Sequence, residues 1–132
     1  MTERFASCRC RQLTAIAEGE PVRISVCHCL ACQKRTGSAF SAQARWPAEC
    51  VTFEGRSSSW TRTADSGQTT TYHFCPDCGS TVHYGGGNYP DLVAIPLGAF
   101  DDPYVEGIDY SVWERRKHGW VEICGDDVQH SD

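Results

Sequence analysis

The stretch Cys27-His28-Cys29-Leu30-Ala31-Cys32 places three cysteines within six positions of a 132-residue chain. A second stretch, Cys75-Pro76-Asp77-Cys78, is a CxxC turn whose two sulfurs can converge on one metal ion, and Gly79 lets the chain leave this turn with little steric cost. A third stretch, Cys8-Arg9-Cys10, is a CxC near the N-terminus. Most of the nine cysteines therefore lie in clusters that are typical of metal ligands.

The clustered cysteines divide into a set of four and a set of three. A structural zinc site takes four ligands in a closed tetrahedron, and two pairs supply them, Cys8 with Cys10 and Cys75 with Cys78. The triple in residues 27–32 leaves one ligand position free, which is typical of a catalytic zinc. Water or a substrate thiolate can take that position, and zinc lowers the pKa of either one.

Other interpretations of these cysteines stay open at the level of sequence. The pairs could be free buried thiols, or the CxxC could form a redox disulfide. The triple could be a second structural site completed by His28 or a distant residue, an occasionally occupied site, or a vestige. Cys50 and Cys124 are isolated, and we expect them to be small buried or half-buried side chains.

The composition is that of a soluble globular domain, with 40% apolar and 22% charged residues, and the length suits one domain over residues 1–132. The net charge of −5 argues against nucleic acid as the main partner, although Arg115-Arg116-Lys117-His118 forms one small positive patch. No apolar stretch is long enough to span a bilayer, and the N-terminal residues do not resemble a signal peptide. We therefore expect a cytoplasmic, reducing location, where clustered cysteines more often bind metal than form disulfides.

Short extended segments separated by Gly, Pro, Asp and Ser predict an all-β fold, either a sandwich or a folded-over sheet. Two strands are expected around a turn at Gly19-Glu20-Pro21, and a hairpin is expected around Gly55. The predicted strands are Leu13–Ala17, Val22–Val26, Ala39–Trp46, Val51–Phe53, Ser58–Thr63, Thr69–Phe74, Ser80–Tyr84 and Leu92–Leu97.

Two segments have weak helical patterns. Leu30–Thr36 can form a short helix behind the cysteine triple, and Tyr110–Lys117 is short and rich in residues that disfavour a helix. The run Gly85-Gly86-Gly87-Asn88 is either a lid near the site or, as we favour, a plain loop between strands. It lacks the surrounding motif of a phosphate-binding loop.

The chain resembles the glutathione-dependent formaldehyde-activating enzymes, a family that includes centromere protein V. The resemblance rests on the longer blocks that contain the cysteines, CHCLACQKRTGS at residues 27–38 and FCPDCGS at residues 74–80, preceded by Cys8-Arg9-Cys10. Further matching residues are Ser66-Gly67, Trp113 and Trp120. These residues occur in the family's order and span most of the chain.

The resemblance implies a single-domain β-tent, with folded-over antiparallel sheets stapled by zinc. It implies a structural Zn2+ on Cys8, Cys10, Cys75 and Cys78, and a second, catalytic Zn2+ on Cys27, Cys29 and Cys32. It also implies a carbon–sulfur lyase like S-(hydroxymethyl)glutathione synthase, whose partners are a small thiol such as glutathione and an aldehyde such as formaldehyde. Neither nucleic acid nor a membrane is an expected partner, and the sequence does not set the oligomeric state.

The sequence departs from the family pattern at its C-terminal motif, where Ser111 stands at a position that commonly holds His. It also has Ala6-Ser7 and Arg11 around the CxC, where the family often has Gly, and it is short for a member that binds glutathione.

For an enzyme, the open site would bind a thiol in its nucleophilic thiolate form, which adds to an aldehyde carbonyl carbon or leaves in the reverse reaction. Lys34 and Arg35 could offset the charge of three thiolates or hold a substrate carboxylate, or they could be solvated. His28 could shuttle a proton, although its place between two ligands directs it away from the metal. A hydroxyl of Thr36 or Ser38 could support a ligand sulfur.

Two other functions compete with the enzyme. One is a non-catalytic zinc-stabilised binding module, and the other is a thiol carrier or metal-handling protein.

Overall fold

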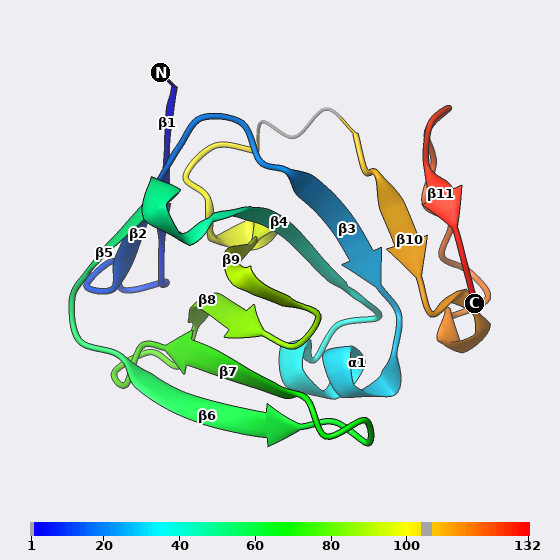
Figure 1. The fold of residues 1–132 in the computed structure, drawn as a ribbon, viewed down its shortest axis with the longest axis horizontal. Helices are drawn as coiled ribbons and strands as arrows, with labels where there is room; N and C mark the ends of the chain where they lie inside the picture. The colour runs from blue at the N-terminus through cyan, green and yellow to red at the C-terminus, as the bar shows by residue number, and fades with distance from the viewer. Residues whose placement is uncertain (1, 104–106) are drawn as a thin grey trace.

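The chain folds into two β-sheets and one short α-helix in the computed structural model, which describes residues 2–103 and 107–132. The larger sheet has eight strands, in the order β11 (Gln129–His130), β10 (Tyr110–Val112), β3 (Arg23–Cys27), β4 (Ser41–Pro47), β9 (Tyr89–Pro96), β8 (Thr81–Gly86), β7 (Thr69–Phe74) and β6 (Ser58–Thr63). This sheet curls around α1 (Leu30–Thr36), so that β4 and β7 lie on different sides of the helix (Figure 1).

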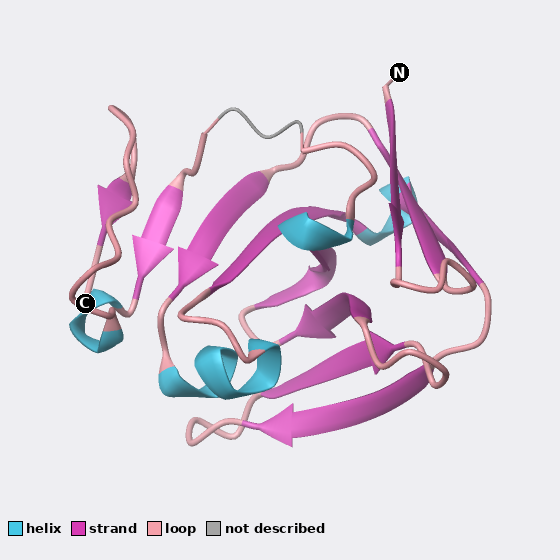
Figure 2. Cartoon of the chain, turned by 180° about the vertical axis from the view of Figure 1, so that it is seen from behind, coloured by secondary structure: helices cyan, strands magenta, loops and turns pink. Residues whose placement is uncertain are grey.

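The smaller sheet contains β1 (Glu3–Ser7), β2 (Thr14–Glu18) and β5 (Val51–Glu54), with β2 in the middle and both pairings antiparallel. It lies at the end of the molecule away from β10 and β11 (Figure 2). Three short 3-10 turns complete the described elements, Ala48–Cys50, Leu97–Ala99 and Glu114–Arg116.

The mainly β fold predicted from the sequence is confirmed, and each of the predicted strands overlaps an observed one. The helix predicted at Leu30–Thr36 is present with those bounds. The sequence pattern did not reveal β1, β10 or β11, which are short or carry few apolar residues. The antiparallel expectation holds except at β10, which runs parallel to both of its neighbours.

Tyr110–Lys117 forms no helix, as its residue types indicated, because Tyr110–Val112 pairs as β10 with β3 and only Glu114–Arg116 forms a 3-10 turn. One local prediction is wrong. The hairpin around Gly55 does not form, since β5 pairs with β2 and β6 pairs with β7. Gly55 has φ +103°, and a Cβ there would lie 2.0 Å from the backbone oxygen of Gln12, so the chain passes closely over the smaller sheet on its way to the larger one.

The predicted turn at residues 19–21 lies between β2 and β3 as expected, and it connects the two sheets. Beside it, Trp46 is fully buried, donates from Nε1 to the Gly19 oxygen at 3.0 Å and packs its ring 5.6 Å from that of Phe100. Each fully buried large apolar side chain contributes roughly 1.5–3 kcal/mol. The same core includes Cys8 and Cys75, so the core and one cysteine cluster are continuous.

A stack of rings also joins the two sheets. Phe53 on β5 stacks on His83 of β8 at 3.8 Å between ring centroids, and His83 stacks on His73 of β7 at 4.4 Å. Burial, with a smaller contribution from His73, lowers the pKa of His83 to about 4. The neutral imidazole is therefore the form that fits between the sheets.

We expect this stack to make stability depend on pH. The pKa of His83 is lower in the folded chain than its ordinary value of about 6.5, so its contribution is complete above that pH and is lost as pH falls toward 4. A part-exposed ring should contribute about 1–2 kcal/mol to this loss. His83→Phe keeps the stack without a titrating group. The free energy of unfolding in urea, measured at pH 7, 6 and 5, should therefore fall less with pH for the variant than for the wild type. Subtracting the two curves removes the acid sensitivity of the cysteines, and a difference that is constant with pH would contradict the prediction.

Candidate metal centres and pocket

Cys8, Cys10, Cys75 and Cys78 lie together with all four sulfurs within 4.8 Å of one another. The Sγ atoms of Cys8 and Cys10 are 3.6 Å apart, and those of Cys10 and Cys75 are 3.7 Å apart. Zinc–sulfur bonds of about 2.3 Å in a tetrahedron separate the sulfurs by about 3.8 Å. The four-cysteine cluster thus has the spacing that a zinc ion requires.

Hydrogen-bond donors surround these sulfurs. The backbone N–H groups of Leu13 and Asp77 donate to the sulfurs of Cys8 and Cys75 at 3.3 Å, and Gln12 Nε2 donates to Cys75 at 2.9 Å. A further hydrogen bond joins Cys78 Sγ to the Ser80 hydroxyl at 3.5 Å and lowers the pKa of Cys78 to about 5. Donors of this kind favour thiolates, the form of cysteine that binds metal.

The second cluster forms where β3 meets α1. Cys27 is the last residue of β3, Cys29 is the N-cap of the helix, and Cys32 lies in its first turn with its N–H 3.4 Å from the Cys29 sulfur. Gly37, with φ +69°, ends the helix and lets the chain turn back into β4. The three sulfurs also lie within 4.8 Å of one another, and all three residues are half-buried.

The sulfurs of this cluster shift one another's pKa values. Hydrogen bonds with Cys27 and Cys29, and to a smaller extent the charge of Arg35, lower the pKa of Cys32 to about 2. Hydrogen bonds with the same neighbours raise the pKa of Cys27. The fold therefore provides two groups of sulfurs, four and three, that could each hold a metal ion such as zinc.

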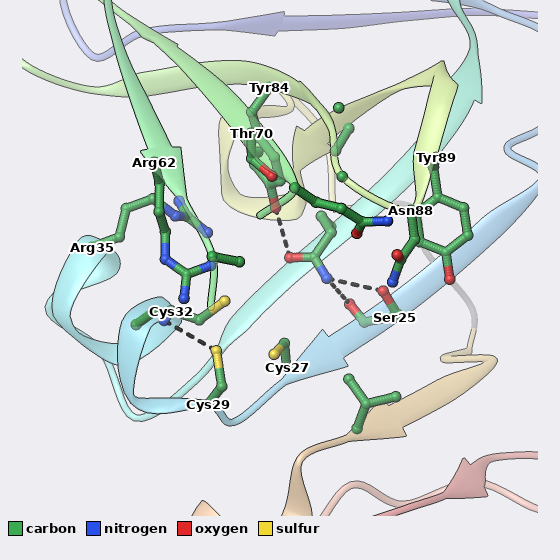
Figure 3. Close-up of a pocket in the computed structure, with 18 of the residues that line it drawn as sticks. Ser25, Cys27, Cys29, Cys32, Arg35, Arg62, Thr70, Tyr84, Asn88 and Tyr89 are labelled. Carbon is green, nitrogen blue, oxygen red and sulfur yellow. Dashed lines mark hydrogen bonds between the residues drawn. The ribbon is translucent and has the colours of Figure 1, made fainter. Parts of the chain in front are cut away.

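A pocket of about 680 Å³ opens beside the triple, which contributes Cys27, Cys29 and Cys32 to its wall (Figure 3). None of the four sulfur-bearing residues of the other cluster lines it. Strands β3, β4, β7, β8 and β9 and helix α1 supply most of the remaining wall, and the turns after β6 and β8 add to it.

Successive side chains of β3 and β4 point to opposite faces of the sheet, so that one face lines the pocket and the other enters the core. Ser25 pairs with Gln43 and Cys27 pairs with Ser41 in the antiparallel register, while the alternating Ala44 and Trp46 enter the core. Buried polar groups at the base of the pocket bond to each other: Tyr84 Oη donates to Gln43 Oε1 at 2.7 Å, and Gln43 Nε2 donates to Ser25 Oγ at 2.9 Å. Burial raises the pKa of Tyr84, which keeps its hydroxyl a donor.

A family profile described as "glutathione-dependent formaldehyde-activating enzyme" matches residues 3–121. The chain belongs to this family. A crystal structure of a Rhodobacter sphaeroides protein from structural genomics is similar with a TM-score of 0.58, covering 79% of this chain and 89% of that one at 15% sequence identity, which shows a shared fold. No curated protein matches the chain. Within the described residues, no helix is long and apolar enough to cross a membrane.

Several residues that were candidates for the site on the basis of the sequence lie away from the pocket. His28 is fully buried, packs against Phe40 and bonds through Nε2 to Ser111 Oγ at 2.9 Å, so the proton-shuttle hypothesis is not supported by its position. Burial lowers the pKa of His28. Ser111, the departure from the family pattern, thus serves as the partner of this buried histidine. Lys34 is exposed on α1, whereas Arg35 lines the pocket.

The remaining expectations concern smaller features. The Thr36 hydroxyl donates to the Cys32 carbonyl oxygen at 2.9 Å and caps the helix, and no hydrogen bond from it to a sulfur is found in the described chain. Residues 85–88 line the pocket; Gly85 and Gly86 end β8, and the expected loop between strands is confined to Gly87 and Asn88. Cys50 is half-buried as expected, whereas Cys124 is exposed, and all nine cysteines are free.

Apart from Arg35, the aromatic and basic residues of the pocket were not predicted from the sequence as site residues. Tyr72, Tyr84 and Tyr89 line it together with Arg23, Arg35, Arg45, Arg62 and Arg116. Alternation along β3 and β4 was the available signal, because Arg23, Ser25 and Cys27 share one face of their strand.

Two cysteine variants should separate the roles of the clusters. Cys75→Ser removes a sulfur of the four-cysteine cluster that is fully buried at the core, so we expect it to prevent folding or to lower the melting temperature by roughly 10 °C or more. Cys29→Ser keeps a hydrogen-bond acceptor at the helix N-cap, so we expect it to lower the melting temperature by less than about 5 °C. Thermal unfolding and zinc content per chain would be measured for both. Equal unfolding of the two variants would contradict the division into a structural and an open cluster.

Proposed function

We propose that the chain is a zinc-dependent carbon–sulfur lyase that acts on the adduct of glutathione, or a similar thiol, with an aldehyde. S-hydroxymethylglutathione is such an adduct. The observation that carries the proposal is the placement of the three-cysteine cluster in the wall of a large pocket, apart from the four-cysteine cluster. The family name supplies glutathione and formaldehyde as the first substrates to test.

The sulfurs present fit the proposed metal. Cys8, Cys10, Cys75 and Cys78 would hold a structural zinc that joins the two sheets as a β-tent, and Cys27, Cys29 and Cys32 would hold the catalytic one. With three protein ligands, a bound zinc has a free position that favours the thiolate form of an incoming thiol.

The reaction balances without an oxidant or reductant. In the synthetic direction, the thiol sulfur bonds to the carbonyl carbon of the aldehyde, and the thiol proton passes to the carbonyl oxygen. The lyase direction breaks the same carbon–sulfur bond and returns the proton to sulfur.

The residues of the pocket suit an anionic sulfur. The guanidinium of Arg35 acts electrostatically on Cys32 and lies 4.8 Å from the ring centroids of both Tyr72 and Tyr84, so these rings fix it beside the cluster. Its charge opposes the repulsion that three thiolates exert on a fourth.

We also propose a reducing compartment such as the cytoplasm, because metal-binding thiolates and nine free cysteines need to escape oxidation. The competing possibility, a zinc-stabilised binding module without turnover, makes no use of a free ligand position.

The first test is zinc content of protein purified without chelator, followed by zinc X-ray absorption with and without glutathione. We expect two zinc ions per chain, and a rise from about 3.5 to about 4 sulfurs per zinc when glutathione binds. S-methylglutathione, which lacks a thiol, is the matched ligand control. Carbon-13 NMR exchange between formaldehyde and its glutathione adduct should be accelerated by the wild type and not by Cys29→Ser.

A zinc content near one ion per chain, with sulfur coordination unchanged by glutathione, would contradict the proposed enzyme and favour the binding module. Two zinc ions with no change in sulfur coordination and no accelerated exchange would do the same.

A further inference from the structure

The pocket beside the cysteine triple is strongly basic although the chain is acidic overall. Five of the twelve Lys and Arg residues line it, against one acid among the described lining residues, Asp65. Four of the five arginines are half-buried, namely Arg23, Arg35, Arg45 and Arg62. None of these four has an ion pair with a carboxylate in the described part of the chain.

The first pair of arginines lies on the Cys32 side of the pocket. Figure 3 shows Arg35 and Arg62 there, and both charges act on the neighbouring Tyr72. The Nε of Arg35 is buried without a hydrogen-bond partner within the described chain. This pair presents two guanidinium groups to the pocket on one flank of the triple.

The second pair lies on the other flank, near Ser25 and Tyr89. Arg23 and Arg45 are directly opposite each other in the register of β3 and β4, and both guanidinium groups lie against the Tyr89 ring, at 5.2 and 4.8 Å from its centroid. Arg45 Nη1 also donates to Ser25 Oγ at 3.1 Å. The Nε of Arg23 is a second buried nitrogen without a partner in the described residues.

Such pairs are costly in the free protein. Like charges directly opposite each other on two strands destabilise a sheet, and half-buried guanidinium groups lose hydration without gaining a carboxylate. Tyrosine faces compensate only in part. Two such pairs in one pocket, one on each flank of the cysteine triple, indicate that a ligand supplies the missing negative charge at two points.

We propose that the pocket selects thiol substrates that carry two separate acid groups and no compensating amine, one acid group for Arg35 with Arg62 and one for Arg23 with Arg45. Asp65, together with the one negative charge that three thiolates would leave on a zinc ion, offsets two of the four guanidinium charges. Two positive charges then remain for the acid groups of the thiol, and they would repel an amine. Arginine forks fit both carboxylate and phosphate, so either acid group meets the requirement. This inference deepens the proposed function and rests on it for the position of the thiol.

Four ligands that differ in charge test the proposal on the zinc-loaded wild type by calorimetry. N-acetylglutathione has two carboxylates and no amine, glutathione has the same carboxylates with an amine, and glutathione diethyl ester has neither carboxylate free. Coenzyme A tests phosphate as the acid group. We expect N-acetylglutathione or coenzyme A to bind more tightly than glutathione, and the diester to bind about 10- to 100-fold more weakly than glutathione.

Matched variants then assign the subsites. Arg62→Gln and Arg45→Gln should each weaken binding of the best dianionic thiol about 10- to 100-fold and leave binding of the diester unchanged within about twofold. Lys34→Gln is the control, because it removes an exposed charge from α1 outside the pocket. Thermal unfolding checks that the variants fold, and the comparison of ligands on the wild type stands even where a variant does not.

Equal affinity for glutathione and its diester would overturn the proposal, as would weaker binding of both N-acetylglutathione and coenzyme A than of glutathione. A failure of the proposed function has a different signature. S-methylglutathione binding as tightly as glutathione, with loss in Arg62→Gln, would keep the acid subsites and contradict thiolate binding at the zinc. A new zinc–sulfur contact from both glutathione and its diester at equal affinity would keep the thiolate chemistry and reject the subsites.

Discussion

The contact among the sulfurs of Cys8, Cys10, Cys75 and Cys78 joins parts of the chain that are 65 residues apart, and the arrangement of the two sheets depends on it. The first pair follows β1 of the smaller sheet, and the second pair lies between β7 and β8 of the larger sheet. Closing so long a loop costs entropy that a small core offsets poorly, and a metal ion that binds the folded form alone would offset it. The cluster is continuous with the core around Trp46, so metal binding and core packing would reinforce each other.

With the sheets held in this way, the alternation of side chains along β3 and β4 creates two environments from the same strands. Ala44 and Trp46 enter the core on one face, and Arg45 with Ser25 reaches the pocket on the other. The same alternation carries Cys27 to the end of β3 on the pocket side, where the helix begins and the other two cysteines follow within one turn. The proposed catalytic cluster is thus fixed by a strand end and a helix N-cap, which are rigid parts of the fold.

The sequence predicted the elements better than their pairing. Strand positions and the division of the cysteines follow from local patterns, such as alternation and the CxxC spacing. The strands and cysteine clusters of the structure agree with these patterns. The pairing of β5 with β2 depends on the close passage of Gly55 over Gln12, a contact between residues far apart in sequence that no local pattern encodes. The basic pocket was missed for a related reason, since Arg23, Arg45 and Arg62 are isolated in the sequence and come together only through strand register and curl.

The net charge of −5 describes the whole surface and says little about this pocket, where the walls reduce solvent screening and the arginine charges combine. The arginines could be thought to serve only the cysteine cluster, because three thiolates around a divalent zinc leave one negative charge. Arg35 is placed for that task beside Cys32, and one guanidinium is enough for it. Arg23 and Arg45 lie on the opposite flank, where Arg23 lies against the rings of Tyr110 and Tyr89. Arg45 lies against Tyr89 and donates to Ser25, so neither arginine is held by a sulfur. Their charge is therefore left over after the cluster is neutralised, and an anionic group of the substrate is the simplest partner for it.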